Sequence, residues 1–458
     1  MKIIFLTLLG VITTTLAFGQ DHKAQQLDSL FSALHQKNSF NGNVLIAEGG
    51  HVILEKSYGY ADENTKRELN LNSIFELASV SKQFTAMGIL LLEKQHKLKS
   101  DDKLAKYIPE LDFYGDITIA NLLNHTSGLP DYIELFEEKW DKSKFATNQD
   151  IVEMFAKHKP ELLFKPNEKF EYSNTGYALL GLIIEKASNT SFEDFLKTNI
   201  FDPLQMHNTF VHRSRFKPKK IDNYAFGYVL DESGNKVLTD SFGKSYLSYY
   251  LDGIVGDGMV NSTVRDLLIW DRALYTNQLI DDNDRAKLYQ TSTTADGKTT
   301  AYNYGWSIAQ SNKYGNIASH SGGWAGYITF IERHLTNDKT IIFLQNNSLP
   351  STKLPTKVVR QILYNEKIVI EKQVNLNSED LDKYLGVYAN DEFPMSIAIT
   401  KIDNVLYAQA TGQMAIPLDA YENNTFKFDQ AGITMVFNPE NNSFELSQGG
   451  MKITFIKK

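Results

Sequence analysis

Cysteine is absent from the 458 residues of this chain. The absence excludes a disulfide framework, a thiol nucleophile and lipid attachment at an N-terminal cysteine. A chain of this length can bury an extensive core, so it does not need disulfides to fold, even outside the cytoplasm. The lack of cysteine therefore limits the chemistry of the chain and not its stability.

Concentrated positive charge is also missing. The formal net charge is −8, and the longest C-terminal basic stretch is only Lys457-Lys458. Because a nucleic-acid partner requires a basic surface, we expect none. The 10 histidines are scattered and form no His-Glu-x-x-His motif. We therefore predict no metal site and no cofactor.

One apolar run opens the chain. Lys2 precedes the run from Ile3 to Leu16, and Ala17 and Gly19 place small residues at positions −3 and −1 of a cut before Gln20. This pattern predicts a secretory signal peptide over residues 1–19. A membrane anchor is the alternative, but the run is short and interrupted by three threonines. We expect a secreted or periplasmic bacterial protein with no stable membrane anchor after cleavage.

A long segment, residues 20–371, has strand patterns at both ends and helical patterns in its middle. Residues 44–55 and 327–344 each resemble a β-hairpin, because apolar runs flank a short polar turn. Helical periodicity lies at 23–37, 177–186, 264–274 and 354–364. The arrangement predicts an α+β domain: one antiparallel sheet closed by the two ends of the segment, flanked by helices and carrying a helical subdomain.

The sequence changes character after residue 372. Six short apolar runs alternate with turns rich in Asn and Gly, at 384–388, 395–399, 406–410, 425–428, 434–437 and 452–456. We predict a small C-terminal all-β domain, resembling a β-barrel, over residues 372–458.

Ser79 and Lys82 stand at the start of an apolar run, Gln83 to Leu92, that is predicted to be a buried helix. Residues three apart on a helix share a face, so the serine hydroxyl and the lysine amine can meet. Burial lowers the pKa of an amine, which lets a lysine accept a serine proton near neutral pH. The other Ser-x-x-Lys quartets begin at residues 100, 214, 233 and 241, and none of them opens an apolar helix. Ser79 and Lys82 are therefore the candidate nucleophile and base.

Two later motifs carry chemistry of the same kind. Tyr172 and Asn174 lie just before a predicted helix, where a phenol can relay a proton and an amide can hold both a lysine and a substrate carbonyl. His320, Gly322 and Gly323 precede an apolar strand. Glycine permits close approach of a substrate to a strand edge, and a backbone N–H near Gly323 can serve as an oxyanion donor beside that of the serine.

The order Ser-x-x-Lys, Tyr-x-Asn, His-x-Gly resembles that of the serine β-lactamase and penicillin-binding protein superfamily. The tyrosine that opens the middle motif is similar to the class C β-lactamase and D-alanyl-D-alanine carboxypeptidase branch. Residues 122–132, 256–262 and 304–306 also resemble segments that recur in that branch. The resemblance covers residues 25 to 367, nearly all of the chain between the signal peptide and the C-terminal domain.

The resemblance implies a role for each residue. Ser79 would be acylated, Lys82 would be its general base, Tyr172 would pass a proton to the leaving group, and Asn174 would orient the substrate. His320 stands where β-lactamases usually carry a lysine that binds the substrate carboxylate. A neutral imidazole holds an anion poorly, so this departure puts β-lactamase activity in doubt.

The resemblance predicts a serine hydrolase that acts on a small molecule or a peptide through an acyl-enzyme. Peptidase and esterase activity are both open, and the oligomeric state is not predicted. A protein of the same fold that binds penicillin or peptides with little turnover is the alternative. His125 and Ser127 could form a separate Ser-His pair, but no acid is placed to orient the histidine, which favours a packing role.

Overall fold

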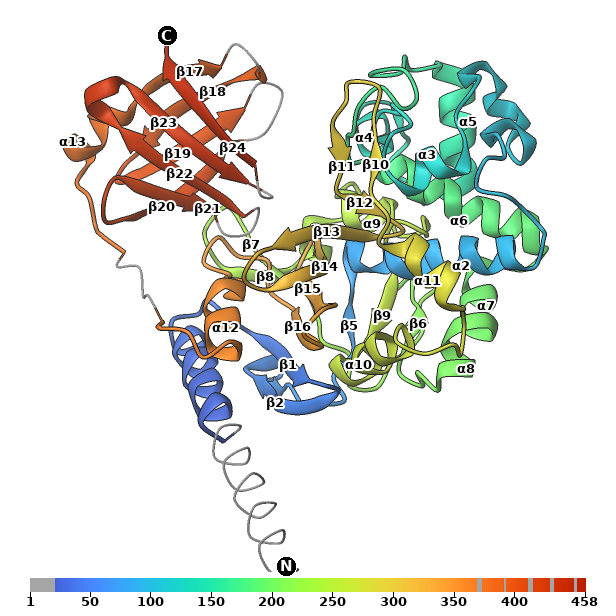
Figure 1. Cartoon of the computed structure of the whole chain (residues 1–458), viewed down its shortest axis with the longest axis horizontal. Helices are drawn as coiled ribbons and strands as arrows, with labels where there is room; N and C mark the ends of the chain where they lie inside the picture. Colours follow the sequence, from blue (N-terminus) through green and yellow to red (C-terminus); the bar gives the residue numbers. More distant parts are fainter. Residues whose placement is uncertain (1–20, 369–372, 391–392, 411–414, 429–431, 449–450) are drawn as a thin grey trace, which may run out of the picture. The chain divides into compact units, whose positions relative to one another are not determined.

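A computed structural model describes residues 21–368, 373–390, 393–410, 415–428, 432–448 and 451–458 (Figure 1). The predicted signal peptide, 1–19, lies outside these residues. By its internal contacts the chain divides into two units, Met1–Leu349 and Pro350–Lys458. Each unit has a hydrophobic core of its own. Among the described residues, no helix combines the length and the apolar content needed to cross a bilayer.

A seven-stranded antiparallel sheet forms the centre of the first unit. The N-terminal hairpin joins the late strands because β1 pairs with β16, with Val44 opposite Phe343. Strands β1 and β16 do not alternate between buried and exposed residues, because both strands are covered on both faces. In order across the sheet, the strands are β12 (Tyr302–Asn303), β13 (Trp306–Ser311), β14 (Gly315–Trp324), β15 (Tyr327–His334), β16 (Lys339–Gln345), β1 (Gly42–Glu48) and β2 (His51–Tyr58).

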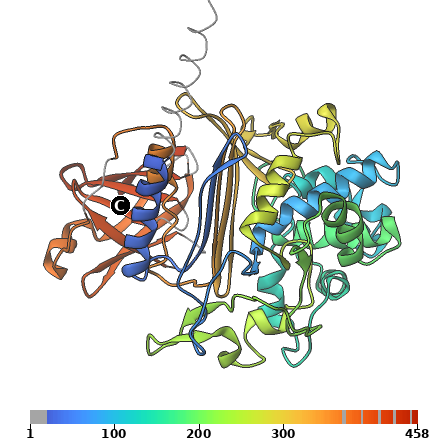
Figure 2. The same ribbon diagram turned by 90° about the horizontal axis from the view of Figure 1, so that it is seen from below.

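Helices cover both faces of this sheet. Figure 2 shows the helix of residues 21–36 on one face and the remaining helices of the unit on the other. The first helix is held by Phe31, whose ring lies 5.4 Å from that of Phe343. On the opposite face, α10 (Val264–Ala273) packs against β1 and β16.

The helical subdomain surrounds α2 (Lys82–Lys94) and α6 (Asn174–Ser188), which pack against each other. Both helices are apolar around most of their circumference, which is typical of helices buried on all sides. The other helices of this unit are α3 (Ile119–Leu123), α4 (Tyr132–Lys139), α5 (Asn148–His158), α7 (Phe192–Leu196), α8 (Asp202–Leu204), α9 (Leu247–Tyr250) and α11 (Asp282–Leu288).

Short strands connect the subdomain to the main sheet. A three-stranded sheet has the order β5 (Phe75–Glu76), β9 (Val260–Ser262), β6 (Phe210–Val211), and its first strand leads directly to Ser79. The remaining short strands form two-stranded pairs: β3 (Tyr60–Asp62) with β4 (Arg67–Glu68), β7 (Tyr228–Leu230) with β8 (Lys236–Leu238), and β10 (Ser292–Thr293) with β11 (Thr299–Thr300).

The second unit contains a closed barrel of eight consecutive strands. Its core is aromatic, with Tyr388, Phe437 and Phe444 in mutual ring contact. The strands are β17 (Gly386–Asn390), β18 (Phe393–Ile402), β19 (Val405–Ala410), β20 (Ile416–Tyr421), β21 (Thr425–Phe428), β22 (Ile433–Asn438), β23 (Ser443–Gln448) and β24 (Met451–Lys457); the helices are α12 (Thr356–Leu363) and α13 (Ser378–Leu381).

The predicted fold class is confirmed: an antiparallel sheet closed by the two ends of its segment, helices around it, and a C-terminal all-β barrel. Strands β20 and β23 are absent from the prediction, because Pro417 and Asp419 interrupt the first and polar residues alternate along the second. The sequence puts the domain boundary after residue 371, whereas the contacts divide the chain after Leu349, so that α12 groups with the barrel.

The separate cores predict that the two units unfold separately. Phe444 is fully buried in the barrel core, so Phe444→Ala should destabilise the barrel by about 3–5 kcal/mol. Differential scanning calorimetry should show one transition shifted to lower temperature and a second one unchanged. A single transition that shifts as a whole would contradict independent cores.

Candidate active site

Ser79 and Lys82 meet at the junction of a short 3₁₀ helix, Ala78–Ser81, and α2. The Lys82 Nζ lies 3.1 Å from the Ser79 Oγ, as their spacing predicts. Ala78 has a φ of +50°, which costs a residue with a Cβ roughly 1 kcal/mol or more. This strained backbone turns the chain sharply from β5 into the helix and places Ser79 at the turn.

The Lys82 amine has no exposed surface and three hydrogen-bond partners. Besides Ser79, it donates to the Oδ1 of Asn174 and to the backbone oxygen of Asp257, both at 2.9 Å. The amide and carbonyl oxygens can only accept, whereas the serine hydroxyl carries a proton. A neutral Lys82 can therefore take a proton from only one of its three partners, Ser79.

Asn174 begins α6, and its amide is fixed at both ends. Its Oδ1 accepts from Lys82, and its Nδ2 donates to the Oδ2 of Asp131 at 2.8 Å. The same carboxylate caps α4 by accepting from the Ile133 N–H. Asp131 thus orients the amide that holds the lysine. Asp131 lies in the segment 122–132, but its sequence context indicates no role for it, because its partner Asn174 lies in another part of the chain.

Asp257 is anchored in a similar way. Its carboxylate accepts a 3.0 Å hydrogen bond from the Tyr132 hydroxyl, while its backbone oxygen accepts from Lys82. Burial raises the pKa of the Asp257 carboxyl, and the charge of Lys82 opposes that rise. Asp257 is a second residue whose role no sequence motif indicates.

Tyr172 stands at the mouth of the site, with 39% of its surface exposed. The Lys82 Nζ lies 5.0 Å from the centre of its ring, close enough for a cation–π contact. The other face of the site is an aromatic cluster, in which the His125 ring lies 4.3 Å from that of Tyr172. The predicted packing role of His125 agrees with this contact, and Ser127 is buried with its Oγ accepting from the Leu129 N–H.

His320 is buried, and both of its ring nitrogens have protein partners. Its Nδ1 lies 2.6 Å from the Ser321 carbonyl oxygen, which can only accept, so this nitrogen carries the proton. Its Nε2 then accepts from the Tyr302 hydroxyl at 2.8 Å. Burial lowers the pKa of His320 to about 3, and the nearby Lys82 charge adds to the effect. The imidazole is therefore neutral, both of its nitrogens have protein partners, and it does not line the cavity beside Ser79.

The two glycines of the third motif, Gly322 and Gly323, differ in how closely other atoms pack against them. A Cβ on Gly322 would collide with the Leu77 carbonyl and with Thr329, whose hydroxyl donates to that same carbonyl at 2.7 Å. Gly322 thus lets β14 lie against the backbone that precedes Ser79. A Cβ on Gly323 would meet nothing within 4 Å. Strand β13 pairs with β14 only as far as Ser319, so one edge of β14 is unpaired beside the site.

A cavity of about 300 Å³ opens in front of the nucleophile, and we call it the Ser79 cavity. Of the predicted site residues, Ser79, Tyr172, Asn174 and Gly323 line it. The other three, Lys82, His320 and Gly322, are not part of its wall, although Lys82 is hydrogen-bonded to Ser79. Among the described residues, no group of three or more His, Asp or Glu side chains could hold a metal ion.

The pair of glycines provides a matched test of this packing. Gly322→Ala should destabilise the protein by about 1–3 kcal/mol, because the methyl group overpacks the contact with Leu77. Gly323→Ala, one residue later, should leave the unfolding free energy nearly unchanged. Urea denaturation of both variants measures the difference, and equal stability would contradict the close approach of β14.

The buried histidine predicts a dependence of stability on pH. In the unfolded chain a histidine has a pKa of about 6.5, whereas the pKa of His320 is about 3. Between these values the unfolded state binds the extra proton, so stability falls as the pH falls, by up to ~1.4 kcal/mol per pH unit. His320→Gln should make the loss between pH 7.0 and 5.0 shallower in urea unfolding. An identical slope would mean that His320 titrates normally.

The comparisons with known proteins agree with this geometry. A family described as Beta-lactamase matches residues 27–363. "Penicillin-binding protein 4*" of Bacillus subtilis is 41% identical over 408 residues, which cover 87% of this chain and 90% of the relative. "Protein flp" of Staphylococcus aureus is 30% identical over 372 residues, covering 79% of this chain and 69% of that protein.

Solved structures show the same fold. The penicillin-binding protein homologue of Pyrococcus abyssi, described as octameric, has a TM-score of 0.66 at 23% identity and covers 94% of this chain and 99% of its own. The penicillin-binding protein of Bacillus halodurans has a TM-score of 0.61 at 25% identity over 69% of this chain and 94% of that one. The resemblance drawn from the three motifs is thereby confirmed, and the chain belongs to the beta-lactamase family, among the serine hydrolases and penicillin-binding proteins that share this fold.

Proposed function

We propose that this protein is an exported serine hydrolase that cleaves an amide or an ester through an acyl-enzyme on Ser79. One observation carries the proposal: of the three hydrogen-bond partners of the buried Lys82, only the Ser79 hydroxyl has a proton to give. The predicted signal peptide supports export, to the periplasm or the surroundings of a bacterial cell.

The acylation step follows from the positions of the side chains. Lys82 takes the Ser79 proton as the Oγ attacks the substrate carbonyl carbon, and a tetrahedral oxyanion forms. The backbone N–H groups of Ser79 and Gly323 are the proposed donors to that oxyanion. Lys82 then gives its proton to the Tyr172 hydroxyl as that hydroxyl protonates the leaving nitrogen or oxygen and the bond breaks; the Tyr172 ring lies beside Lys82. In the second step Lys82 takes a proton from water as the water oxygen attacks the acyl carbon, and the Ser79 Oγ leaves with that proton, which releases the acid.

The charges around the Ser79 cavity favour some substrates over others. No lysine or arginine is among the described residues that line it, although Glu76 and Asp257 are. His320 is neutral and its nitrogens are occupied. The site therefore offers no cation to a substrate carboxylate, which favours esters and uncharged amides over anionic β-lactams. The name of the B. subtilis relative supports acylation by penicillin, although not its efficient turnover.

Two substitutions test the nucleophile and the base. Ser79→Ala should abolish labelling by a fluorescent penicillin and by a fluorophosphonate, and should lower turnover by on the order of 10⁴-fold or more. Lys82→Arg keeps the charge but cannot deprotonate, so acylation should slow by about 10²–10⁴-fold. Gel fluorescence and hydrolysis of nitrocefin, short p-nitrophenyl esters and D-amino-acid peptides provide the readouts.

Ser127→Ala is the matched control, because Ser127 lies two residues after His125 and its Oγ accepts from the backbone N–H of Leu129. It should be labelled like the wild type. Labelling that survives in Ser79→Ala would refute the assignment of the nucleophile. Labelling of Ser79 without turnover of any substrate would instead favour the alternative, a penicillin-binding or peptide-binding protein with little hydrolysis.

A further inference from the structure

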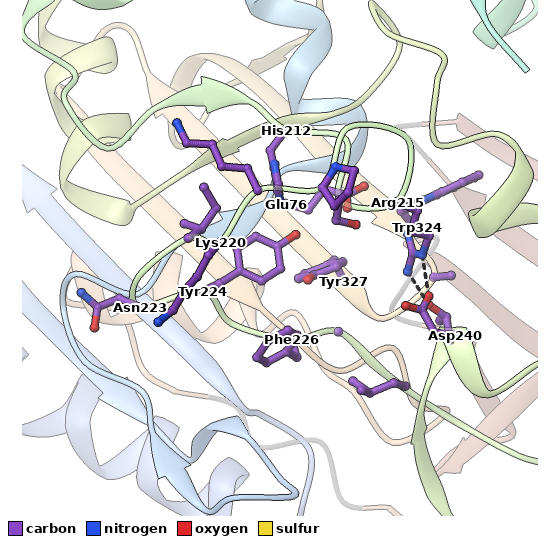
Figure 3. Close-up of a pocket in the computed structure, with 18 of the residues that line it drawn as sticks. Glu76, His212, Arg215, Lys220, Asn223, Tyr224, Phe226, Asp240, Trp324 and Tyr327 are labelled. Atoms are coloured by element: carbon purple, nitrogen blue, oxygen red, sulfur yellow. Dashed lines mark hydrogen bonds and ion pairs between the residues drawn. The ribbon is translucent and has the colours of Figure 1, made fainter. Parts of the chain in front are cut away.

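Figure 3 shows a second cavity, of about 720 Å³. It shares Glu76 and Trp324 with the wall of the Ser79 cavity, so the two cavities are neighbours. We call the second one the Glu76 cavity. Its wall comes from β5, from residues 212–227 and from the turn between β14 and β15.

Glu76 is the last residue of β5, three positions before the nucleophile, and its backbone pairs with Asn261 of β9. The residue is only 5% exposed. Its carboxyl group makes no hydrogen bond or ion pair with any other described residue, which is rare for a buried acid. Burial raises its pKa to about 8; the charge of Asp252 adds to the rise and that of Arg215 opposes it.

Aromatic rings surround this carboxyl group. Tyr224, Phe226, Trp324 and Tyr327 line the same cavity, and Figure 3 shows the rings of Tyr224 and Tyr327 close to Glu76. Burial raises the pKa of both phenols, and the Glu76 charge adds to the rise, so both stay protonated. A carboxylate among the faces of aromatic rings is the combination that binds ammonium groups in proteins, by charge and by cation–π attraction.

None of the cations in the wall of the Glu76 cavity forms an ion pair with Glu76. Arg215 is paired with Asp240 and Asp252, whereas Arg67 donates to the backbone oxygen of Tyr224 and its Nη1 is buried without a hydrogen-bond partner among the described residues. Lys219 and Lys220 are exposed at the rim, where water and salt screen them. These lysines repel free cations, so an ammonium group reaches Glu76 best when the rest of its molecule is held at Ser79.

We propose that the Glu76 cavity is a substrate subsite for a primary ammonium group, with Glu76 as its partner and the surrounding rings as its walls. The inference deepens the proposed hydrolase function and rests on it: the preferred substrates are amides or esters that carry a free amine. The three sequence motifs do not predict this subsite, because none of them includes Glu76.

Matched pairs of substrates test the subsite, each pair differing only by acetylation of one amine. The first pair is Nα-acetyl-D-lysine p-nitroanilide and its Nα,Nε-diacetyl form; the second is D-alanine p-nitroanilide and its N-acetyl form. At pH 8, in at least one of the two pairs, the compound with the free amine should have a kcat/KM roughly tenfold higher than that of its acetylated form. The readout is the ratio within one protein, so a general loss of activity cancels.

Glu76→Gln keeps the shape of the side chain but removes the charge, and should bring the ratio close to one. Asp222→Asn removes a charge from an exposed position in the wall of the same cavity and should preserve the ratio. A preference that survives Glu76→Gln, or falls equally in Asp222→Asn, would overturn the proposal. So would a wild-type preference for the acetylated compounds, which would make the rim lysines an anion site.

The pH dependence of the wild type gives a second test that needs no variant. The lysine ε-amine, with a pKa of about 10.4, stays charged from pH 6.5 to 9, whereas Glu76 ionises near pH 8. The charged groups nearest Glu76 are Asp252 and Arg215, and the neighbouring His212 has a lowered pKa and stays neutral. The ratio for the lysine pair should therefore rise with pH over this range. A flat ratio argues against Glu76 as the partner.

Failure of the hydrolase function would look different. In that case no compound is turned over and the fluorophosphonate does not label Ser79. The same ratios can then be measured as binding constants of the four compounds by calorimetry, with the same variants. Equal binding of the free and acetylated compounds would overturn the subsite in that case as well.

Discussion

The buried amine of Lys82 is the constraint on which the site depends. A polar group without exposed surface must find hydrogen-bond partners in the protein, because leaving it unpaired would cost several kcal/mol. Its three partners come from the 3₁₀ helix before α2, the start of α6 and the loop before β9. The lysine thereby joins segments that are far apart in the sequence, and the acceptors themselves are held by Asp131 and Tyr132. The nucleophile is positioned by this network as much as by its own helix.

Much of this was open to prediction from the sequence. The contact of Ser79 with Lys82 follows from their spacing and from the apolar helix behind them, since helical geometry alone brings such residues together. The sheet closed by two distant hairpins was also predictable, because apolar strand patterns stood at both ends of one segment. In these cases a local pattern determines the structure, and the tertiary fold agrees with it.

Other features depend on tertiary contacts that no local pattern reports. Asp131 and Asp257 act through partners 43 and 125 residues away along the chain. The neutral imidazole of His320 was expected from the sequence, but its burial and its hydrogen bonds to the Tyr302 hydroxyl and the Ser321 carbonyl were not, because both depend on the tertiary fold. Strands β20 and β23 were not predicted, because Pro417 and Asp419 interrupt the first and polar residues alternate along the second. Their pairing with neighbouring strands in the closed barrel makes them strands.

The charges around the nucleophile then decide what the site can hold. Lys82 is fully engaged, His320 is neutral, and the charged side chains in the described wall of the Ser79 cavity are both acids, Glu76 and Asp257. Asp257 already accepts from Tyr132, so Glu76 is the one of these two with an unused carboxyl group. An enzyme of this fold that selects a substrate carboxylate needs a cation at this place. In this protein the unpaired charged group in the wall is an acid, Glu76. Its complement would be a substrate amine and not a substrate carboxylate.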